Sequence, residues 1–176
     1  MSHRMDVILN KEIVANTWRM VSENEALAEL LQAAGNLVVP LSLWQQERAA
    51  LAGRSGKTGV WLKGPDDPAQ LQLNGTAPDL PLIAIEFAQF VDGRGYSIGR
   101  LLRERYGFKG ELRAFGDVFR DQLPYLTRCG FNSFVLKEGK SLEDALKAFD
   151  DFSDAYQNAA DQPVPHYRRR LAAAAA

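Results

Sequence analysis

The sequence predicts an α/β fold, in which a mostly parallel sheet of about five βα units carries a small N-terminal hairpin. Two observations predict this fold. Short apolar runs recur about one βα unit apart, and each is followed by residues with the three-to-four spacing of a helix. The runs cover residues 37–39, 59–62, 82–87, 112–115 and 131–136. The chain has 176 residues, 46% of them hydrophobic, so it can bury one sizeable core.

The N-terminal residues alternate between apolar and polar side chains. This pattern predicts two short strands, residues 7–9 and 13–20, joined around Asn10 and Lys11. We expect this hairpin to be an addition to the main sheet. A helix with one apolar face follows, and Gly35 ends it.

Two later segments give the clearest helical patterns. Residues 97–106 and residues 141–156 each carry an apolar stripe with the spacing of a buried helix face. Ser141 and Asp144 begin the second helix with the spacing of a capping box. These helices occupy the crossover positions that a parallel sheet requires.

Two architectures fit this order of elements, an open doubly wound sheet and a partial barrel. In both, ligands bind at the carboxyl ends of the strands, where the βα loops gather. No long linker interrupts the series, so residues 1–160 are predicted to form a single α/β domain. Residues 161–176 are predicted to form a flexible C-terminal tail.

Composition excludes several classes of function. The net charge is −1, which gives no overall field toward nucleic acid, and no basic, aromatic RNA platform is present. Cys129 is the one cysteine and the two histidines lie near the chain ends, so no metal site is predicted, neither zinc nor a protein-ligated iron–sulfur cluster. The N-terminus lacks the apolar core of a signal peptide, and no apolar run could span a membrane. We therefore expect a cytoplasmic protein.

The densest polar cluster comprises Asp92, Arg94, Tyr96 and Ser97, in a glycine-rich turn before a predicted helix. Two interpretations remain open. In the first, Asp92 or Ser97 caps the helix and Tyr96 packs against the core. In the second, Arg94 or Ser97 contacts an anionic or polar ligand at the helix N-terminus. The glycine spacing is not that of a dinucleotide-binding fingerprint.

A second cluster contains Asp117 and Asp121, in a loop after the fourth apolar run. Either both carboxylates cap backbone amides in an ordinary turn, or they belong to a ligand site at the strand end. Glu86 and Arg113 are charged residues within apolar runs, where a buried charge needs a partner. If their strands are neighbours they form an ion pair, either as a structural tie or as the floor of a ligand site.

Charge is also uneven along the chain. Residues 92–120 carry a net charge of +3 and residues 138–161 a net charge of −5. Solvated helix faces explain both segments, and docking to a charged protein partner is the sharper alternative. Lys63 and Lys137 each follow an apolar run and would place ammonium groups at the carboxyl edge of the sheet.

Several segments together resemble a bacterial protein family of unknown function. They are residues 90–97, 100–107, 110–117, 121–126 and 129–131, and the similarity extends over residues 5–157. The resemblance implies an oxidoreductase connected with sulfite reduction, encoded beside assimilatory sulfite reductase. It carries over no catalytic residues.

Sulfite reduction uses sirohaem and an iron–sulfur cluster, and one cysteine cannot hold such a cluster. The chain is therefore not expected to be the catalytic subunit. The leading hypothesis is an accessory or electron-delivery protein acting with sulfite reductase. The alternative is a small α/β enzyme that binds an anionic ligand at the strand carboxyl ends, and a flavin or nicotinamide cofactor stays open for either.

Overall fold

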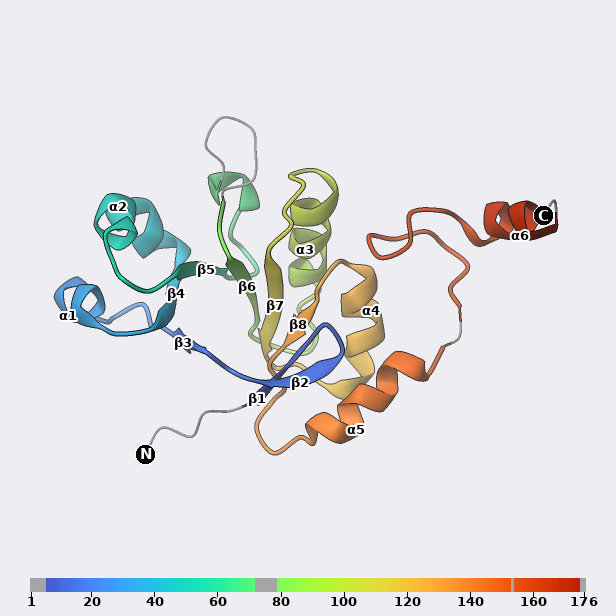
Figure 1. Ribbon diagram of the computed structural model, residues 1–176, viewed down its shortest axis with the longest axis horizontal. Helices are drawn as coiled ribbons and strands as arrows, with labels where there is room; N and C mark the ends of the chain where they lie inside the picture. Colours follow the sequence, from blue (N-terminus) through green and yellow to red (C-terminus); the bar gives the residue numbers. More distant parts are fainter. Residues whose placement is uncertain (1–5, 72–78, 153, 175–176) are drawn as a thin grey trace.

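A single eight-stranded sheet organises the molecule. The computed structural model describes residues 6–71, 79–152 and 154–174 (Figure 1). The strands follow the order β2-β1-β8-β7-β6-β5-β4-β3, and all neighbours from β3 to β8 are parallel. These six strands are β3 Trp18–Met20, β4 Asn36–Pro40, β5 Thr58–Leu62, β6 Leu82–Phe87, β7 Glu111–Gly116 and β8 Ser133–Phe134. The mostly parallel α/β prediction is confirmed, with one more parallel strand than the five predicted.

The N-terminal hairpin consists of β1 (Asp6–Leu9) and β2 (Glu12–Ala15). Its two turn residues, Asn10 and Lys11, have φ values of 52° and 67°, as the tight turns of antiparallel hairpins require. β1 also pairs antiparallel with β8, so the hairpin extends the main sheet. The predicted second strand, residues 13–20, is wrong in length, because it divides into β2 and β3.

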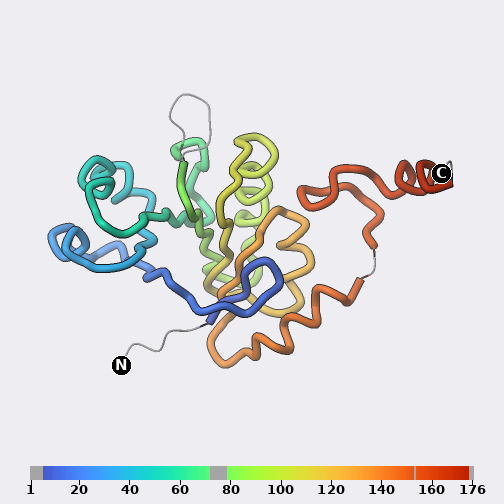
Figure 2. Tube along the Cα trace, in the orientation of Figure 1, coloured from blue at the N-terminus to red at the C-terminus, as the bar shows by residue number. Residues whose placement is uncertain are grey.

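The division at residue 15 forces the sheet to curl. β2 and β3 lie at opposite edges of the sheet, yet only Asn16 and Thr17 separate them in sequence. Three peptide links span at most about 11 Å, whereas the outer strands of a flat eight-stranded sheet would lie about 34 Å apart. The sheet is accordingly a curled half-barrel, and the N-terminal chain runs across it from the hairpin to β3 (Figure 2). Of the two predicted architectures, the structure is the partial barrel.

Most of the helices lie around the outside of this half-barrel, whereas the C-terminal one stands away from it (Figure 1). The helices are α1 Leu27–Gln32, α2 Leu41–Ala52, α3 Arg94–Glu104, α4 Leu123–Arg128, α5 Leu142–Leu146 and α6 His166–Ala174, with short 3₁₀ turns at Pro68–Leu71, Arg120–Gln122 and Lys147–Asp150. The predicted helix over residues 141–156 is too long, because helical structure ends at Asp150. Within the described ranges, no helix is long and apolar enough to cross a membrane.

Both faces of the parallel strands are covered, which explains their continuous apolar runs. The outer face packs under the helices and supplies most of the core, including Val39, Leu62 and Ile85. A smaller cluster on the inner face is built from Val38, Trp61, Leu82 and Ala84, against which Trp18, Met20 and Phe115 pack. The Trp61 indole donates a hydrogen bond to the Val21 carbonyl over 2.9 Å, which ties β5 to the chain that follows β3.

Candidate functional site

Three loops meet at the carboxyl edge of the parallel sheet. Phe90, Phe119 and Lys137 each lie three residues beyond the end of β6, β7 and β8, respectively. The Phe90 and Phe119 rings meet edge to face, with 5.7 Å between their centroids. The ammonium groups of Lys137 and Lys140 lie 5.2 and 5.4 Å from the centroid of the Phe119 ring. Val91 extends this cluster, and we call these five residues the Phe119 surface.

The Phe119 surface is open to solvent at its centre. Phe90 is 50% exposed and Val91 is 83% exposed, although both are large apolar side chains. Cations over aromatic faces are attracted by the negative charge of the ring, so the two lysines are held at the border of the apolar patch. A patch of this composition is typical of a surface that contacts another protein.

Carboxylates pair with the lysines of this edge. Lys137 binds the Asp117 carboxylate over 2.8 Å, and Lys63 binds Glu23 over 2.7 Å. The hydrogen bond that Lys63 donates to Glu23 raises the pKa of Lys63, and the negative charge of Glu86 acts in the same direction. Both lysines therefore reach the predicted edge, each already neutralised by a carboxylate.

Asp92 and Arg94 form a tight pair at the start of α3. Two side-chain hydrogen bonds of 2.9 and 2.7 Å join them, and the Arg94 amide donates to the same carboxylate over 3.1 Å. These bonds from Arg94 lower the pKa of Asp92 from 3.8 to about 2. The loop after β5 packs on this pair at Gly64, where a Cβ atom would lie 2.8 Å from the Asp92 carboxylate. Asp92 thus accepts a hydrogen bond from the first residue of α3, but the N-cap position is Gly93, without a side-chain cap, so Asp92 is not the predicted cap.

Tyr96 packs against other aromatic side chains and does not line an open site. Its ring lies between those of Phe87 and Tyr125, with centroid distances of 5.2 and 5.1 Å. Its hydroxyl accepts a hydrogen bond of 3.0 Å from Gln122, and burial raises the pKa of the phenol. This arrangement agrees with the packing interpretation of Tyr96.

The other predicted site residues lie apart from one another. Ser97 is exposed on α3, beside a shallow hollow formed with Arg100 and Arg105, and Asp121 is exposed in the turn before α4. The N-cap position of α4 is Gln122, so Asp121 does not cap that helix. The side chains that the sequence analysis placed in candidate ligand sites therefore do not meet at one site.

Arg113 lies on the inner face of the sheet and is 2% exposed. Its guanidinium donates hydrogen bonds of 2.6 and 2.9 Å to Glu111, 3.1 Å to Ser133 and 3.0 Å to Asn16. The predicted ion pair with Glu86 is not formed. In the register of β6 and β7, Arg113 lies opposite Ala84, and Glu86 lies one pleat further along. Arg113 is therefore a structural tie between β7, β8 and the chain that crosses the half-barrel.

Sequence reasoning did not find Phe90, Val91, Phe119 or Lys140. A signal was present, because large apolar residues stood in polar loops directly after apolar runs. Their convergence could be recognised only once β6, β7 and β8 were known to be neighbours.

The open hollow beside Ser97 has a volume of about 440 Å³, and a second hollow near this edge is smaller. A pocket of about 100 Å³ lies beside Glu23, Trp61 and Asp66, below the range of about 300–1,000 Å³ that is typical of ligand sites. In the part of the chain that the structure describes, no three His, Cys, Asp or Glu side chains are grouped as metal ligands would be.

A family model of bacterial proteins of unknown function (DUF934) matches residues 59–167, more than half of the chain. The chain belongs to this family. Searches of curated proteins and of solved structures return no match to the chain. The DUF934 match begins within β5 and ends in α6, so it contains every residue of the Phe119 surface together with Asp92 and Arg94.

Taken together, the carboxyl edge of this DUF934 protein offers an exposed apolar centre with cations at its border. Arg94, Lys63 and Lys137 each have a carboxylate partner within 2.8 Å. An anionic ligand would have to displace one of these carboxylates. The geometry is better suited to contact with a protein surface than to enclosing a small anion.

Proposed function

We propose that this protein is an accessory protein of assimilatory sulfite reduction, which docks on sulfite reductase through the Phe119 surface. The resemblance of residues 5–157 supplies the pathway in this proposal. The observation that supports docking is the exposure of Phe90 and Val91 beside an aromatic ring bordered by two lysines.

Elementary interface energetics favour this surface. Aromatic side chains dominate binding free energies because they bury a large area at low entropic cost, and charged groups at the border direct the approach. Phe119 is partly buried against Phe90, so its ring is held in place before a partner arrives. A partner with an apolar contact and a carboxylate facing Lys140 would complement it, since Lys137 is already paired with Asp117.

The docking proposal rests on this surface and not on the net charge of residues 92–120. The basic residues of that segment are largely neutralised within the chain. Carboxylates pair with Arg94, Arg100, Arg113 and Arg120. Arg103 instead donates hydrogen bonds to the carbonyl oxygens of Phe108, Gly110 and Gly130. We therefore expect salt to weaken the complex only moderately, because apolar contact supplies most of the binding free energy.

The test is co-elution with purified sulfite reductase on a sizing column at low ionic strength, followed by calorimetric titration. Phe119→Ala is expected to weaken binding by about tenfold or more, because loss of an aromatic anchor costs more than about 1.4 kcal/mol. Phe152→Ala makes the same substitution at a phenylalanine outside the surface, one that is 75% exposed, and is the control.

Two results would overturn the proposal. One is the lack of any complex at low ionic strength. The other is a complex that Phe119→Ala and Phe152→Ala leave equally intact, since binding would then use another face of the molecule.

A further inference from the structure

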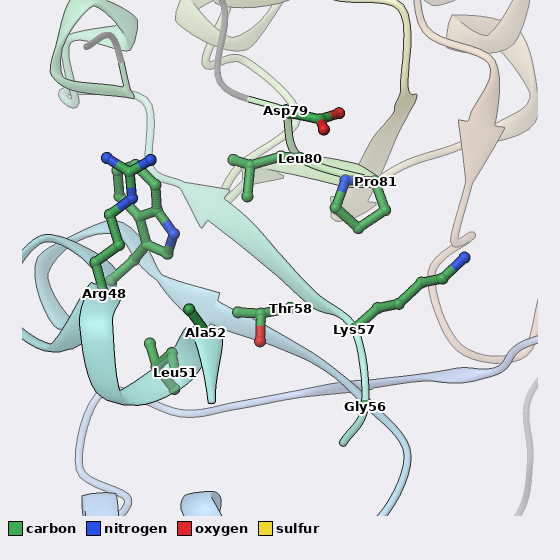
Figure 3. Close-up of a pocket in the computed structure, with 10 residues that line it drawn as sticks. Arg48, Leu51, Ala52, Gly56, Lys57, Thr58, Asp79, Leu80 and Pro81 are labelled. Atoms are coloured by element: carbon green, nitrogen blue, oxygen red, sulfur yellow. The ribbon is translucent and has the colours of Figure 1, made fainter. Parts of the chain in front are cut away.

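A pocket of about 500 Å³ lies at the opposite edge of the sheet, where α2 meets the starts of β5 and β6 (Figure 3). Its volume falls within the range of about 300–1,000 Å³ that is typical of small-molecule sites. Ten residues line it: Trp44, Arg48, Leu51, Ala52, Gly56, Lys57, Thr58, Asp79, Leu80 and Pro81. None of them belongs to the Phe119 surface.

The walls of this pocket are mainly apolar. Trp44 and Leu51 are buried side chains of α2, and Leu80 and Pro81 form the opposite side from the chain that enters β6. Figure 3 shows Leu80 and Pro81 across the pocket from Arg48. A flat apolar group between these two walls would have both of its faces removed from water, which favours binding.

Arg48 is the polar group that gives this pocket its chemistry. The carbon centre of its guanidinium lies 4.9 Å from the centroid of the Trp44 ring, so the cation lies over the indole. Among residues 6–71, 79–152 and 154–174, no carboxylate lies within ion-pair distance of Arg48. This differs from Arg94, Lys63 and Lys137, which are all neutralised at the other edge.

Contact with the indole restrains this exposed guanidinium while leaving its N–H groups available. A planar guanidinium of this kind binds a carboxylate through two parallel hydrogen bonds. Asp79 stands on the other side of the pocket (Figure 3), so its charge would repel an acid group placed there and favour the end at Arg48. The Lys57 side chain extends away from Arg48, so it has no part in the proposed carboxylate contact.

We propose that this pocket binds a small carboxylic acid with a planar apolar body. The carboxylate pairs with Arg48, and the body lies between the α2 wall and Leu80 with Pro81. The pocket lies at the amino ends of the strands, away from the Phe119 surface, so this binding site is independent of the proposed docking function.

The test uses 1-naphthoate as the probe and 1-naphthalenemethanol as its uncharged counterpart, both titrated into the full chain by calorimetry. We expect saturable binding of one 1-naphthoate per chain and at least about tenfold weaker binding of the alcohol, which cannot form the charged hydrogen bonds. In a parallel NMR titration, the indole N–H signal of Trp44 is expected to shift. The Trp44→Phe variant assigns that signal.

Two variants locate the site. Arg48→Ala is expected to weaken 1-naphthoate binding by about tenfold or more, because it removes the charged partner. Arg168→Ala is the matched control, since Arg168 also lies over an aromatic ring, that of Tyr167, and α6 lies on the other side of the molecule from α2 (Figure 1). Circular dichroism checks that both variants are folded.

The proposal fails if 1-naphthoate does not bind saturably or if the alcohol binds equally well. It also fails if Arg48→Ala and Arg168→Ala bind 1-naphthoate with the same affinity. Ala52→Trp gives a second arm, because it fills the pocket while leaving Arg48 in place. Unchanged 1-naphthoate binding by Ala52→Trp would also place the probe elsewhere and overturn the proposal.

Discussion

Single side chains at the carboxyl edge of the sheet are governed by their nearest charged neighbour. Asp92 and Arg94 are two residues apart, so their pairing needs no long-range contact. Lys137 and Asp117 come from loops of different strands, and their 2.8 Å contact depends on β7 and β8 being adjacent. The first kind of contact can be predicted from sequence, whereas the second requires the order of strands.

The Asp92 carboxyl predicts how the stability of the fold depends on pH. Its pKa of about 2 in the folded protein lies below its ordinary value of 3.8, so the ionised form favours folding. This stabilisation is fully present above the ordinary pKa and is lost as the pH falls toward 2. An NMR titration is expected to find the low pKa, and Arg94→Gln to return it toward 3.8. Arg100→Gln, which removes a neighbouring guanidinium with another partner, is expected to leave it unchanged.

The hydrogen bonds of Arg113 predict how much the free energy of unfolding falls when its charged partner is removed. Glu111→Gln removes the countercharge of a buried guanidinium and is expected to lower the free energy of unfolding by about 3 kcal/mol. Glu86→Gln makes the same chemical change one strand away and is expected to alter it by less than about 0.5 kcal/mol. Urea unfolding measures both values. Equal effects would show that Arg113 depends on Glu86 as much as on Glu111.

At the scale of elements, α3 illustrates how close packing on the sheet limits the sequence. A Cβ atom at Gly99 would lie 2.4 Å from the Phe131 ring, and one at Gly95 would lie 2.7 Å from the Phe87 ring. The two rings are themselves in contact, with 5.9 Å between their centroids, so neither can move freely. Glycine lets the helix approach β6 and β8 closely at some cost in helix propensity.

Gly99→Ala tests this close approach. Alanine favours a helix by up to about 1 kcal/mol, but overpacking costs about 1–3 kcal/mol, so a net loss of about 1 kcal/mol is expected. Gly53→Ala, at the end of α2, meets its nearest atom at 3.4 Å and is expected to change stability by less than about 0.5 kcal/mol. Thermal unfolding compares the two. Stabilisation by Gly99→Ala would mean that the helix can move away from the sheet.

Element boundaries were predicted well where the signal was local. The Ser141 hydroxyl accepts a hydrogen bond of 3.1 Å from the Asp144 amide, which confirms the predicted helix start. The end of that helix was predicted wrongly, because Phe152 and Tyr156 continue the apolar spacing but are 75% and 78% exposed. Periodicity shows which residues share a face and does not show whether anything covers it.

At the scale of the whole molecule, the curl of the sheet was beyond the reach of sequence patterns. The run over residues 13–20 has no internal sign that its two halves belong to opposite edges. Strand order is set by which crossovers bury the most apolar surface, and that depends on every helix at once. For the same reason the Phe119 surface, made by three loops, became visible only in the folded chain.

The C-terminal residues give a prediction at this scale. α6 has no buried side chain, and it is tied to the preceding segment by the ion pairs of His166 and Arg169 with Asp154 and by hydrogen bonds from Arg169 to the Ala155 and Val164 carbonyls. Exposed ion pairs contribute little, so removal of residues 166–176 is expected to lower the melting temperature by no more than about 3 °C.

A longer truncation is the comparison. Removal of residues 157–176 also deletes the hydrogen bond from the Ala160 amide to the Arg128 carbonyl and the ion pair of Asp161 with Arg128. It is expected to cost more than the shorter truncation. If both truncations lower the melting temperature equally, α6 itself must stabilise the fold.

The crossing of the N-terminal chain also sets the order in which the protein can be completed. β1 pairs with β8, so the hairpin, which is synthesised before β8, waits for a strand that begins at Ser133. Until then the hairpin has no sheet to join, and Asn16 cannot reach the Arg113 guanidinium on a finished inner face. Such pairings between distant parts of a chain are slow to form. Synthesis therefore leaves the β1–β2 hairpin detached from the main sheet until β8 has been made.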